Sequence, residues 1–325
     1  MTAKKVTIGV LGCANIADRS VIPAIKSLSE KFELVAVASR SFEKAALFAK
    51  RYNCEAIGSY SDIIERSDIG ALYIPLPTGL HKEWIDKALR SGKHVYAEKS
   101  IALTYNDAQK MVGRARQSQV ALMEGYMFQY HTQHAYVKGL IDQGIIGEIR
   151  HFSGSFGFPP LPTGNFRYDA FLGGGVLFDA AGYPLKAAGL FLGDQLTVSG
   201  ASLFWDPLAR VSLYGSAYLT GLNGVGAFIS FGFDNYYQCC YQIWGSKGKI
   251  TVERAYTIKP DEVPTITLET NGTKENINLF PDNHFIGAMH EFHRIIFSDE
   301  KEKHYRAILQ QSNALEKIQQ IAKPV

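Results

Sequence analysis

The first part of the chain alternates short apolar runs with stretches in which apolar residues recur every three or four positions. A run such as Val6 to Leu11 is typical of a strand buried on both faces. The predicted strands are 6–11, 32–39, 71–74, 93–97 and 120–124, and the predicted helices are 16–29, 42–52, 81–91 and 107–117. Strands that alternate with helices predict a parallel sheet with right-handed crossovers.

The pattern changes near Gly125. One more helix is predicted at 131–141, followed by strands at 149–156, 211–219, 226–233, 237–244, 249–255 and 265–269, and by helices at 286–297 and 305–321. Several of these strands alternate apolar and polar residues, as antiparallel strands with one solvated face do. We therefore expect an α/β domain over residues 1–124 and an α+β domain over residues 125–325. The start of the first domain is typical of a dinucleotide-binding site.

Composition narrows the class of protein without naming an activity. The chain has 325 residues, 46% of them hydrophobic and 20% charged, and its net charge is +3 with no basic block. Nothing in this balance indicates a nucleic acid or a membrane surface as a partner. No secretory leader and no apolar run long enough to span a bilayer is recognised, so a cytoplasmic protein is expected. The cysteines Cys13, Cys54, Cys239 and Cys240 form no metal-binding pattern and are expected to be reduced, with no metal bound.

A degenerate glycine-rich turn follows the first predicted strand. Gly12-Cys13-Ala14-Asn15-Ile16-Ala17 has alanine at the second and third glycine positions of the dinucleotide fingerprint. A tight turn followed by a helix N-terminus brings backbone N–H groups to a pyrophosphate. Its place between a strand and a helix makes Gly12, Ala14, Asn15 and Ile16 candidate cofactor contacts.

The end of the second predicted strand indicates which dinucleotide is bound. An NAD site usually has Asp or Glu here, bonded to the ribose 2′-hydroxyl. This chain has Ser39 and Arg40, with Lys44 one helical turn further on. Arg40 can bind a 2′-phosphate through charge-assisted hydrogen bonds, so NADP is the expected cofactor. The alternative is that Ser41 caps the next helix and Arg40 is merely solvated.

A proline-rich segment follows the third predicted strand. Pro75-Leu76-Pro77 ends that strand and stiffens a loop, and Leu76 and Pro77 are expected to lie over the cofactor. His81, four residues later, either contacts the ligand or sits in the first turn of a helix. The sequence leaves both alternatives open.

A lysine, a carboxylate and a phenol form the candidate catalytic group. Glu98 and Lys99 close an apolar run, where a lysine lies at the carboxyl edge of a parallel sheet. Asp179 and Tyr183 follow a glycine triplet and are four residues apart, which puts both on one face of a helix. A lysine and a tyrosine near a nicotinamide can protonate a sugar alkoxide as hydride arrives. Taken singly, they could be a surface lysine and a core tyrosine.

These stretches resemble the glucose–fructose oxidoreductase / inositol dehydrogenase (Gfo/Idh/MocA) family over essentially the whole chain. The resemblance rests on Ser91 to Lys99, Gly144 to Arg150, Gly173 to Asp179, Tyr183-Pro184 and Ala187 to Gly193. Within the family the chain is most similar to NADP-dependent nucleotide-sugar 3-ketoreductases of deoxysugar pathways. Dihydrodiol dehydrogenases share much of the pattern.

The resemblance implies a Rossmann domain joined to a domain with an open, mainly antiparallel sheet. It implies that Lys99 is the catalytic lysine, that Tyr183 stands where many members have His, and that Arg167 and Asp179 contact or order the nicotinamide end, beside Glu98. The family has Glu-Lys-Pro where this chain has Glu98-Lys99-Ser100, which removes a proline restraint on the backbone. Ala181-Gly182 is expected to give freedom beside the phenol.

The expected reaction is reduction of a keto group, at C3 by the resemblance, on a nucleotide-linked deoxysugar, with hydride from NADPH and the proton from Lys99 or Tyr183. Gln129 and His131 lie just past the Rossmann half and could face the sugar, and Tyr236 and Tyr237 could line the sheet side. These are weaker substrate candidates, and tyrosines on a sheet are usually packing residues. The alternatives are a dehydrogenase of a free polyol or dihydrodiol, and a non-catalytic NADP-binding protein.

Assembly is also expected from the β-rich half. Apolar residues such as Phe228, Phe231 and Tyr241 are expected to make the solvent-exposed face of its sheet hydrophobic. This predicts a homodimer or homotetramer formed through that sheet.

Overall fold

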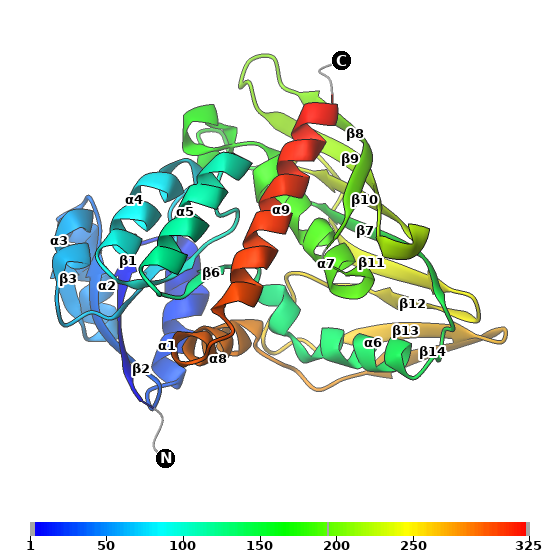
Figure 1. Cartoon of the computed structure of the whole chain (residues 1–325), viewed down its shortest axis with the longest axis horizontal. Helices are drawn as coiled ribbons and strands as arrows, with labels where there is room; N and C mark the ends of the chain where they lie inside the picture. Colours follow the sequence, from blue (N-terminus) through cyan, green and yellow to red (C-terminus); the bar gives the residue numbers. More distant parts are fainter. Residues whose placement is uncertain (1–3, 194, 323–325) are drawn as a thin grey trace. The chain divides into compact units, whose positions relative to one another are not determined.

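A computed structural model of the chain describes residues 4–193 and 195–322. Two compact units are present (Figure 1). The first contains Met1–Gly125 and Phe285–Leu309, and the second contains Tyr126–His284 and Gln310–Val325. The expected division of the chain at residues 124 and 125 stays a prediction, and residues 285–309 belong to the first unit although they come late in the chain.

The first unit is built on a six-stranded parallel sheet with the order β3-β2-β1-β4-β5-β6. Its strands are β1 (Val6–Leu11), β2 (Phe32–Ala38), β3 (Glu55–Ile57), β4 (Ala71–Ile74), β5 (His94–Ala97) and β6 (Leu122–Glu124). The reversal of order at β1 and β4 is the doubly wound arrangement that places ligands at the carboxyl ends of the strands. Both the parallel sheet and the Rossmann topology were predicted from the sequence; the short strand β3 was not.

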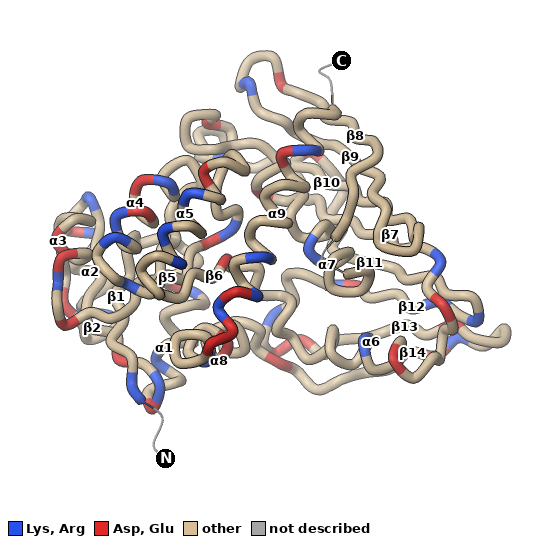
Figure 2. The backbone as a smooth tube through the Cα atoms, viewed as in Figure 1, with Lys and Arg blue, Asp and Glu red and all other residues tan. Residues whose placement is uncertain are grey.

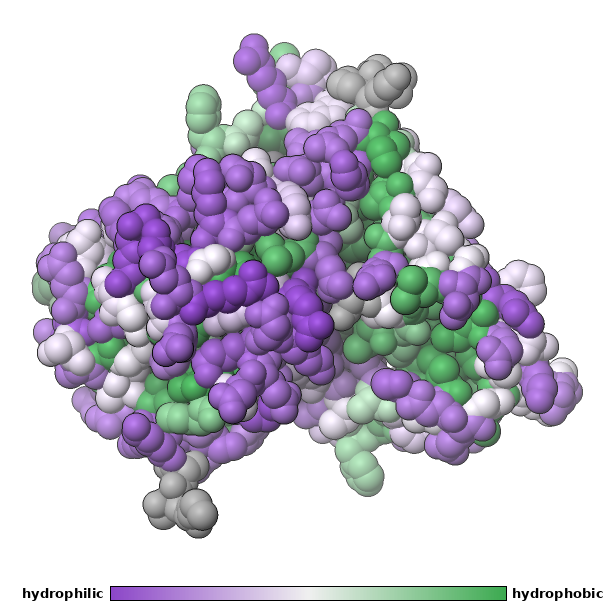
Figure 3. Space-filling view, in the orientation of Figure 1, coloured by the Kyte–Doolittle hydropathy of each residue, from purple (hydrophilic) through white to green (hydrophobic). Residues whose placement is uncertain are grey.

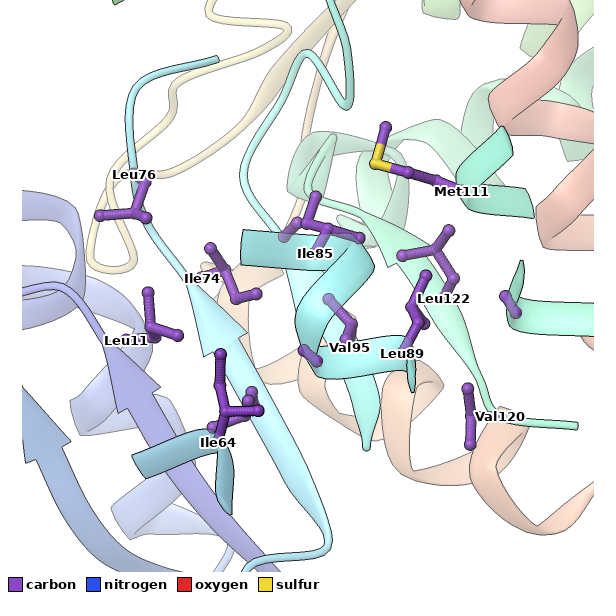
Figure 4. Packing of buried hydrophobic residues seen from close by; sticks show 14 of the residues in the cluster. Leu11, Ile64, Ile74, Leu76, Ile85, Leu89, Val95, Met111, Val120 and Leu122 are labelled. Atoms are coloured by element: carbon purple, nitrogen blue, oxygen red, sulfur yellow. The ribbon is translucent and has the colours of Figure 1, made fainter. Parts of the chain in front are cut away.

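Helices cover this sheet, and α2 and α5 begin at capping residues. The helical elements are η1 (Ala17–Val21), α1 (Ile22–Ser27), α2 (Phe42–Tyr52), α3 (Tyr60–Glu65), α4 (Thr78–Arg90), α5 (Tyr105–Gln117) and α8 (His284–Phe297), and α9 (Lys301–Ile321) also starts here. Ser41 and Thr104 accept backbone N–H bonds from Lys44 and Asp107 at 3.3 and 3.1 Å. The core between the sheet and helices α3 to α5 is aliphatic, as the packing of Ile74, Ile85 and Val95 shows (Figure 4).

The second unit is built on an eight-stranded sheet with the order β14-β13-β12-β11-β7-β10-β9-β8. Its strands are β7 (Ile149–Gly157), β8 (Thr197–Trp205), β9 (Ser212–Thr220), β10 (Gly226–Gly232), β11 (Gln238–Gly245), β12 (Gly248–Val252), β13 (Thr265–Thr270) and β14 (Thr273–Asn278). Among the described strands of this second sheet, only β7 and β10 pair in parallel. The predicted mainly antiparallel sheet is therefore confirmed.

One face of this sheet is covered by α6 (Thr132–Asp142) and α7 (Gly182–Leu192). Tyr241 of β11 packs there against Phe191 of α7, with ring centroids 5.1 Å apart. Phe231 and Tyr241 are 2% and 1% exposed, so the expectation that they lie on an open face is wrong. Side chains alternate along a strand, and Phe228 and Phe231 are an odd number of residues apart, so they cannot share a face.

The two units differ in how they carry charge. Lys, Arg, Asp and Glu are interspersed along α4 and α5, whose outer surface is hydrophilic (Figures 2 and 3). Strands β8, β9 and β10 contain no charged residue, and they are uniformly tan in Figure 2. Across residues 4–193 and 195–322, the structure has no helix that is both long and apolar enough to cross a membrane.

Candidate active site

The turn after β1 has the shape that a dinucleotide needs. Gly12 has φ 126°, and a Cβ built on it would lie 2.9 Å from Leu76, so only glycine fits. Its N–H donates to the Ala38 carbonyl at 3.0 Å, and helical structure begins at Asn15. Ala14, Asn15 and Ile16 thus form the start of a helix at the carboxyl edge of the sheet, where backbone N–H groups favour a phosphate.

The end of β2 presents cationic side chains beside this turn. Ser39 is buried, and its hydroxyl accepts the Ser41 N–H at 3.2 Å, while Arg40 and Lys44 are exposed. Burial raises the pKa of the Cys13 thiol to about 11, and the positive charge of Lys44 opposes that rise. Ser41 caps α2, as the alternative interpretation of this segment predicted. This cap does not involve Arg40, whose exposed guanidinium is still available to a 2′-phosphate.

The loop after β4 is held by a buried histidine. His81 is fully buried, with Nδ1 2.8 Å from the Ser100 carbonyl and Nε2 2.8 Å from the Leu76 carbonyl. Burial lowers its pKa, and a neutral ring has only one N–H to donate to the two carbonyls. Of the two alternatives, the geometry favours the structural one: both ring nitrogens of His81 face backbone carbonyls, those of Leu76 and Ser100, and neither is left for a ligand.

Glu98 and Lys99 follow directly after β5 at the carboxyl edge. The Tyr73 hydroxyl donates to Glu98 Oε1 at 2.7 Å, and the Glu98 N–H donates to the Ile74 carbonyl at 3.0 Å. Lys99 is half-buried, and the peptide bond between Lys99 and Ser100 is cis. The sequence predicts that serine in place of proline leaves this backbone less restrained. In the structure the Ser100 carbonyl instead contacts the buried ring of His81 at 2.8 Å.

In the second unit, a glycine-rich loop leads to an ion pair. Arg167 Nε donates to Asp179 Oδ2 at 2.7 Å, and both side chains are largely buried. The loop crosses so tightly that a Cβ on Gly174 would lie 2.5 Å from the Arg167 carbonyl, and Gly175 has φ 106°. The glycine triplet is therefore explained by close backbone approach, and the structure brings Arg167 and Asp179 together as a charged pair.

Tyr183, in the first turn of α7, sits in a cage of aromatic rings. It is 6% exposed, and its ring centroid lies 4.8 Å from Phe156, 5.5 Å from Tyr126 and 5.9 Å from Phe128 and Tyr256. Such edge and tilted contacts fix the ring of a phenol that has to be positioned. Sequence reasoning missed the cage. Only Phe156 carried a signal, as an alternating position on a predicted strand.

The glycine before this tyrosine does not provide freedom, contrary to the expectation. A Cβ on Gly182 would lie 1.8 Å from the Tyr126 hydroxyl and 2.6 Å from its Cζ. Tyr126 is fully buried, so its ring occupies the space that any side chain at position 182 would need. Gly182 is thus required by close packing beside the phenol.

The three weaker substrate candidates are placed differently. Gln129 is half-buried and donates to the Tyr126 carbonyl at 3.0 Å. His131 is 1% exposed, and its Nδ1 accepts the Gln133 N–H as the N-cap of α6, so it is a structural residue rather than a substrate contact. Tyr236 is 88% exposed on the turn between β10 and β11.

A doubly wound unit with a phosphate-binding turn, joined to a unit that holds a caged tyrosine, defines a nicotinamide-dependent oxidoreductase. Residues 6–126 match the model of the oxidoreductase family with an NAD-binding Rossmann fold, and residues 134–251 match the GFO/IDH/MocA C-terminal domain. The chain belongs to the Gfo/Idh/MocA oxidoreductase family.

Relatives within the family are similar over nearly the full length. The dTDP-3,4-didehydro-2,6-dideoxy-alpha-D-glucose 3-reductases of Saccharopolyspora spinosa and Actinomadura kijaniata are 43% and 39% identical, over 90% and 92% of this chain and 88% and 90% of theirs. A crystal structure of KijD10, a 3-ketoreductase from Actinomadura kijaniata in complex with NADP and TDP-benzene, superposes with a TM-score of 0.94 at 36% identity, covering 99% of both chains.

Proposed function

We propose that this protein is an NADP-dependent 3-ketoreductase that acts on a dTDP-linked 2,6-dideoxy sugar. The observation that carries the proposal is the 43% identity to such a reductase over nine-tenths of the chain, and we assign the acid–base chemistry to Lys99 and Tyr183. The similarity to a structure that holds NADP and a TDP ligand supports both the cofactor and the substrate class.

The residues of the first unit fit NADP. Gly12 leaves a cradle that a Cβ would fill, the helix that begins at Asn15 offers N–H groups to the pyrophosphate, and Arg40 with Lys44 supplies positive charge for a 2′-phosphate. Leu76 and Pro77 form an ordered wall, because His81 fixes the loop. When bound, NADPH supplies the hydride for the C3 carbonyl carbon.

The protein supplies the proton and the electrostatic environment. We propose that Lys99 and Tyr183 act as one unit on the C3 oxygen: the ammonium stabilises the developing alkoxide, and one of the two groups donates the proton. Each group has a carboxylate close to it in the sequence. Asp179, four residues before Tyr183, is held by Arg167, and Glu98, directly before Lys99, is held by Tyr73. The aromatic cage holds the phenol of Tyr183 in a single orientation.

The experiment is a substrate comparison. NADPH consumption is measured with dTDP-3,4-didehydro-2,6-dideoxy-alpha-D-glucose, and NADP reduction is measured with free polyols and a dihydrodiol. Turnover is expected only with the nucleotide-linked ketone. Turnover of a free polyol or dihydrodiol in its place would contradict the proposal, and so would NADPH binding without turnover of any of these compounds.

We also propose that the protein is a homo-oligomer, formed through the open face of the eight-stranded sheet. Five aromatic residues are between 44% and 60% exposed there: Phe204, Tyr214, Tyr218, Phe228 and Trp244. They are accompanied by serines and, on β8 to β10, by no charge. An exposed aromatic face of this kind is typical of an interface between subunits. Because the proposed reaction uses NADPH and a sugar nucleotide, we place the enzyme in the cytoplasm.

A further inference from the structure

The second unit gathers several loops at one end of its sheet. β7, β8, β10 and β12 all finish at this end, because β7 and β10 run in parallel and the other strands pair antiparallel around them. The segment that follows β12 carries Arg254, and the turn before β11 carries Tyr237. Phe156 lies near the end of β7, so Tyr183, which packs on Phe156, lies at the same end.

Tyr237 and Tyr183 also lie on the same face of the sheet. Cys239 pairs with Phe156, and both are buried on the face that α7 covers. Tyr237 precedes Cys239 by two residues, so its side chain points to that face, one step closer to the end of the sheet. Two residues along a strand and one strand across correspond to roughly 8 Å between Tyr237 and Phe156.

Arg254 is fixed above Tyr237. Its Nη1 donates to the Tyr237 hydroxyl at 2.7 Å, its Nε donates to Glu262 at 3.1 Å, and its guanidinium lies 5.1 Å from the centre of the Tyr237 ring. The Tyr237 hydroxyl is also 3.0 Å from Thr257 Oγ1. Arg254 has φ 56°, a left-handed conformation that is uncommon for a residue with a long side chain and worth a functional explanation.

The fixed guanidinium still has donors to offer. An arginine has five N–H donors, and the contacts described for Arg254 use two of them. Its side chain is 41% exposed, so the remaining edge faces solvent at the end of the sheet. Glu262 balances part of its charge, yet a preorganised fork of N–H groups still matches the oxygens of a phosphate.

From this arrangement we infer that Arg254, oriented by Tyr237 and Glu262, binds the diphosphate of the sugar nucleotide. The inference rests on the proposed function. The ketone at C3 and the diphosphate at C1 belong to one sugar ring, so a substrate with C3 at Tyr183 carries its diphosphate only a short distance away. Arg254 contacts Tyr237, and Tyr183 contacts Phe156, so both groups lie on the same face and at the same end of the sheet. Arg167 is paired with Asp179 at 2.7 Å and is 29% exposed, whereas Arg254 is 41% exposed at its longer, 3.1 Å contact with Glu262.

The test measures binding of dTDP to the enzyme loaded with NADP. Arg254→Gln is compared with Arg210→Gln, a matched control: Arg210 is exposed, belongs to the turn at the same end of the sheet and also has a left-handed backbone, with φ 54°. Arg254→Gln should weaken dTDP binding about 10- to 100-fold, the range for hydrogen bonds to charged groups. Arg210→Gln should stay within about twofold of the unchanged protein.

Two further readouts separate binding from misfolding. NADPH affinity should be unchanged in Arg254→Gln, and KM for the sugar nucleotide should rise while kcat stays close to normal, because the diphosphate does not react. Tyr237→Phe, which removes only the hydroxyl that orients Nη1, should show a smaller loss in the same direction. If the unchanged protein binds dTDP and Arg254→Gln binds it equally well, the inference is overturned while the proposed function stands. If the unchanged protein does not bind dTDP, both are overturned.

Discussion

At the residue scale, the proton donor is the first question. Lys99→Met and Tyr183→Phe should each lower turnover about 100-fold or more, the usual scale for general acid catalysis. The double variant should lose little beyond the worse single variant, since residues that act as one unit are not additive. Stopped-flow hydride transfer to the 3-keto sugar nucleotide measures this. Normal turnover in Tyr183→Phe alone would leave lysine as the only acid, and normal turnover in both variants would exclude the mechanism.

Our proposal assigns the preference for NADPH over NADH to Arg40. Arg40→Ala should weaken NADPH binding by about 1.5–3 kcal/mol, because the guanidinium loses an anionic partner, and should hardly change NADH binding. Lys50→Ala, which removes an exposed cation from the same helix α2, is the control and should change neither. Fluorescence titration with both cofactors measures the affinities. Equal losses for NADPH and NADH in Arg40→Ala would rule out a 2′-phosphate site at this residue.

At the scale of elements, helix α7 depends on the absence of one methyl group. Gly182→Ala would push a Cβ into the buried ring of Tyr126 and displace Tyr183, so we expect about 1–3 kcal/mol of lost stability and reduced turnover. Gly139→Ala on α6 is the matched control, because its Cβ would meet no atom closer than 3.8 Å. It should gain about 0.5–1 kcal/mol. Urea unfolding compares the two, and similar stabilities would disprove the packing explanation.

Two buried histidines, His134 of α6 and His284 at the start of α8, should make the second unit sensitive to acid. Burial lowers the pKa of His134 to about 3 and that of His284 to about 4, from an ordinary value of 6.5. Between the folded and unfolded pKa values, the unfolded chain therefore binds protons at these histidines that the folded state does not bind. This stability is complete above about pH 6.5 and is lost as pH falls toward the folded values, by about 2 kcal/mol for each histidine at about pH 5.

Urea unfolding at about pH 7.5 and about pH 5 checks the slope of stability against pH. In His134→Gln the slope should become smaller, whatever the absolute stability of the variant, because one of the buried histidines that take up a proton on unfolding is gone. An unchanged slope in this variant would show that the acid sensitivity has another source.

Elements were easier to predict than contacts between them. The apolar runs of β1 and β4 and the cap at Ser41 depend on neighbouring residues, so the pattern of the chain was enough. The cage around Tyr183 depends on Tyr126 and Tyr256, which are distant in sequence and follow no periodicity. To predict which side chains of the second sheet face solvent, one has to know the register of its strands. The sequence does not give this register, and the prediction that Phe231 is exposed was wrong for that reason.

At the scale of the whole molecule, the open sheet face predicts association. Light scattering at micromolar concentration should give the mass of a dimer or a tetramer. Phe228→Glu places a charge on the open face and should favour the monomer, whereas Leu208→Glu, at a loop residue that is 93% exposed, should not. A monomeric mass for the unchanged protein would contradict the proposal.

The late segment 285–309 also has a consequence for how the protein is made. Phe292 of α8 packs against Phe32 and Tyr96, with ring centroids 6.4 and 5.7 Å apart, and His293 contacts the Lys4 carbonyl at 3.0 Å. Domains usually fold on the ribosome in the order of their synthesis. Here the first unit includes residues 285–309, which are translated after nearly all of the second unit. The cofactor-binding unit is therefore the first to be started and is completed only late in synthesis.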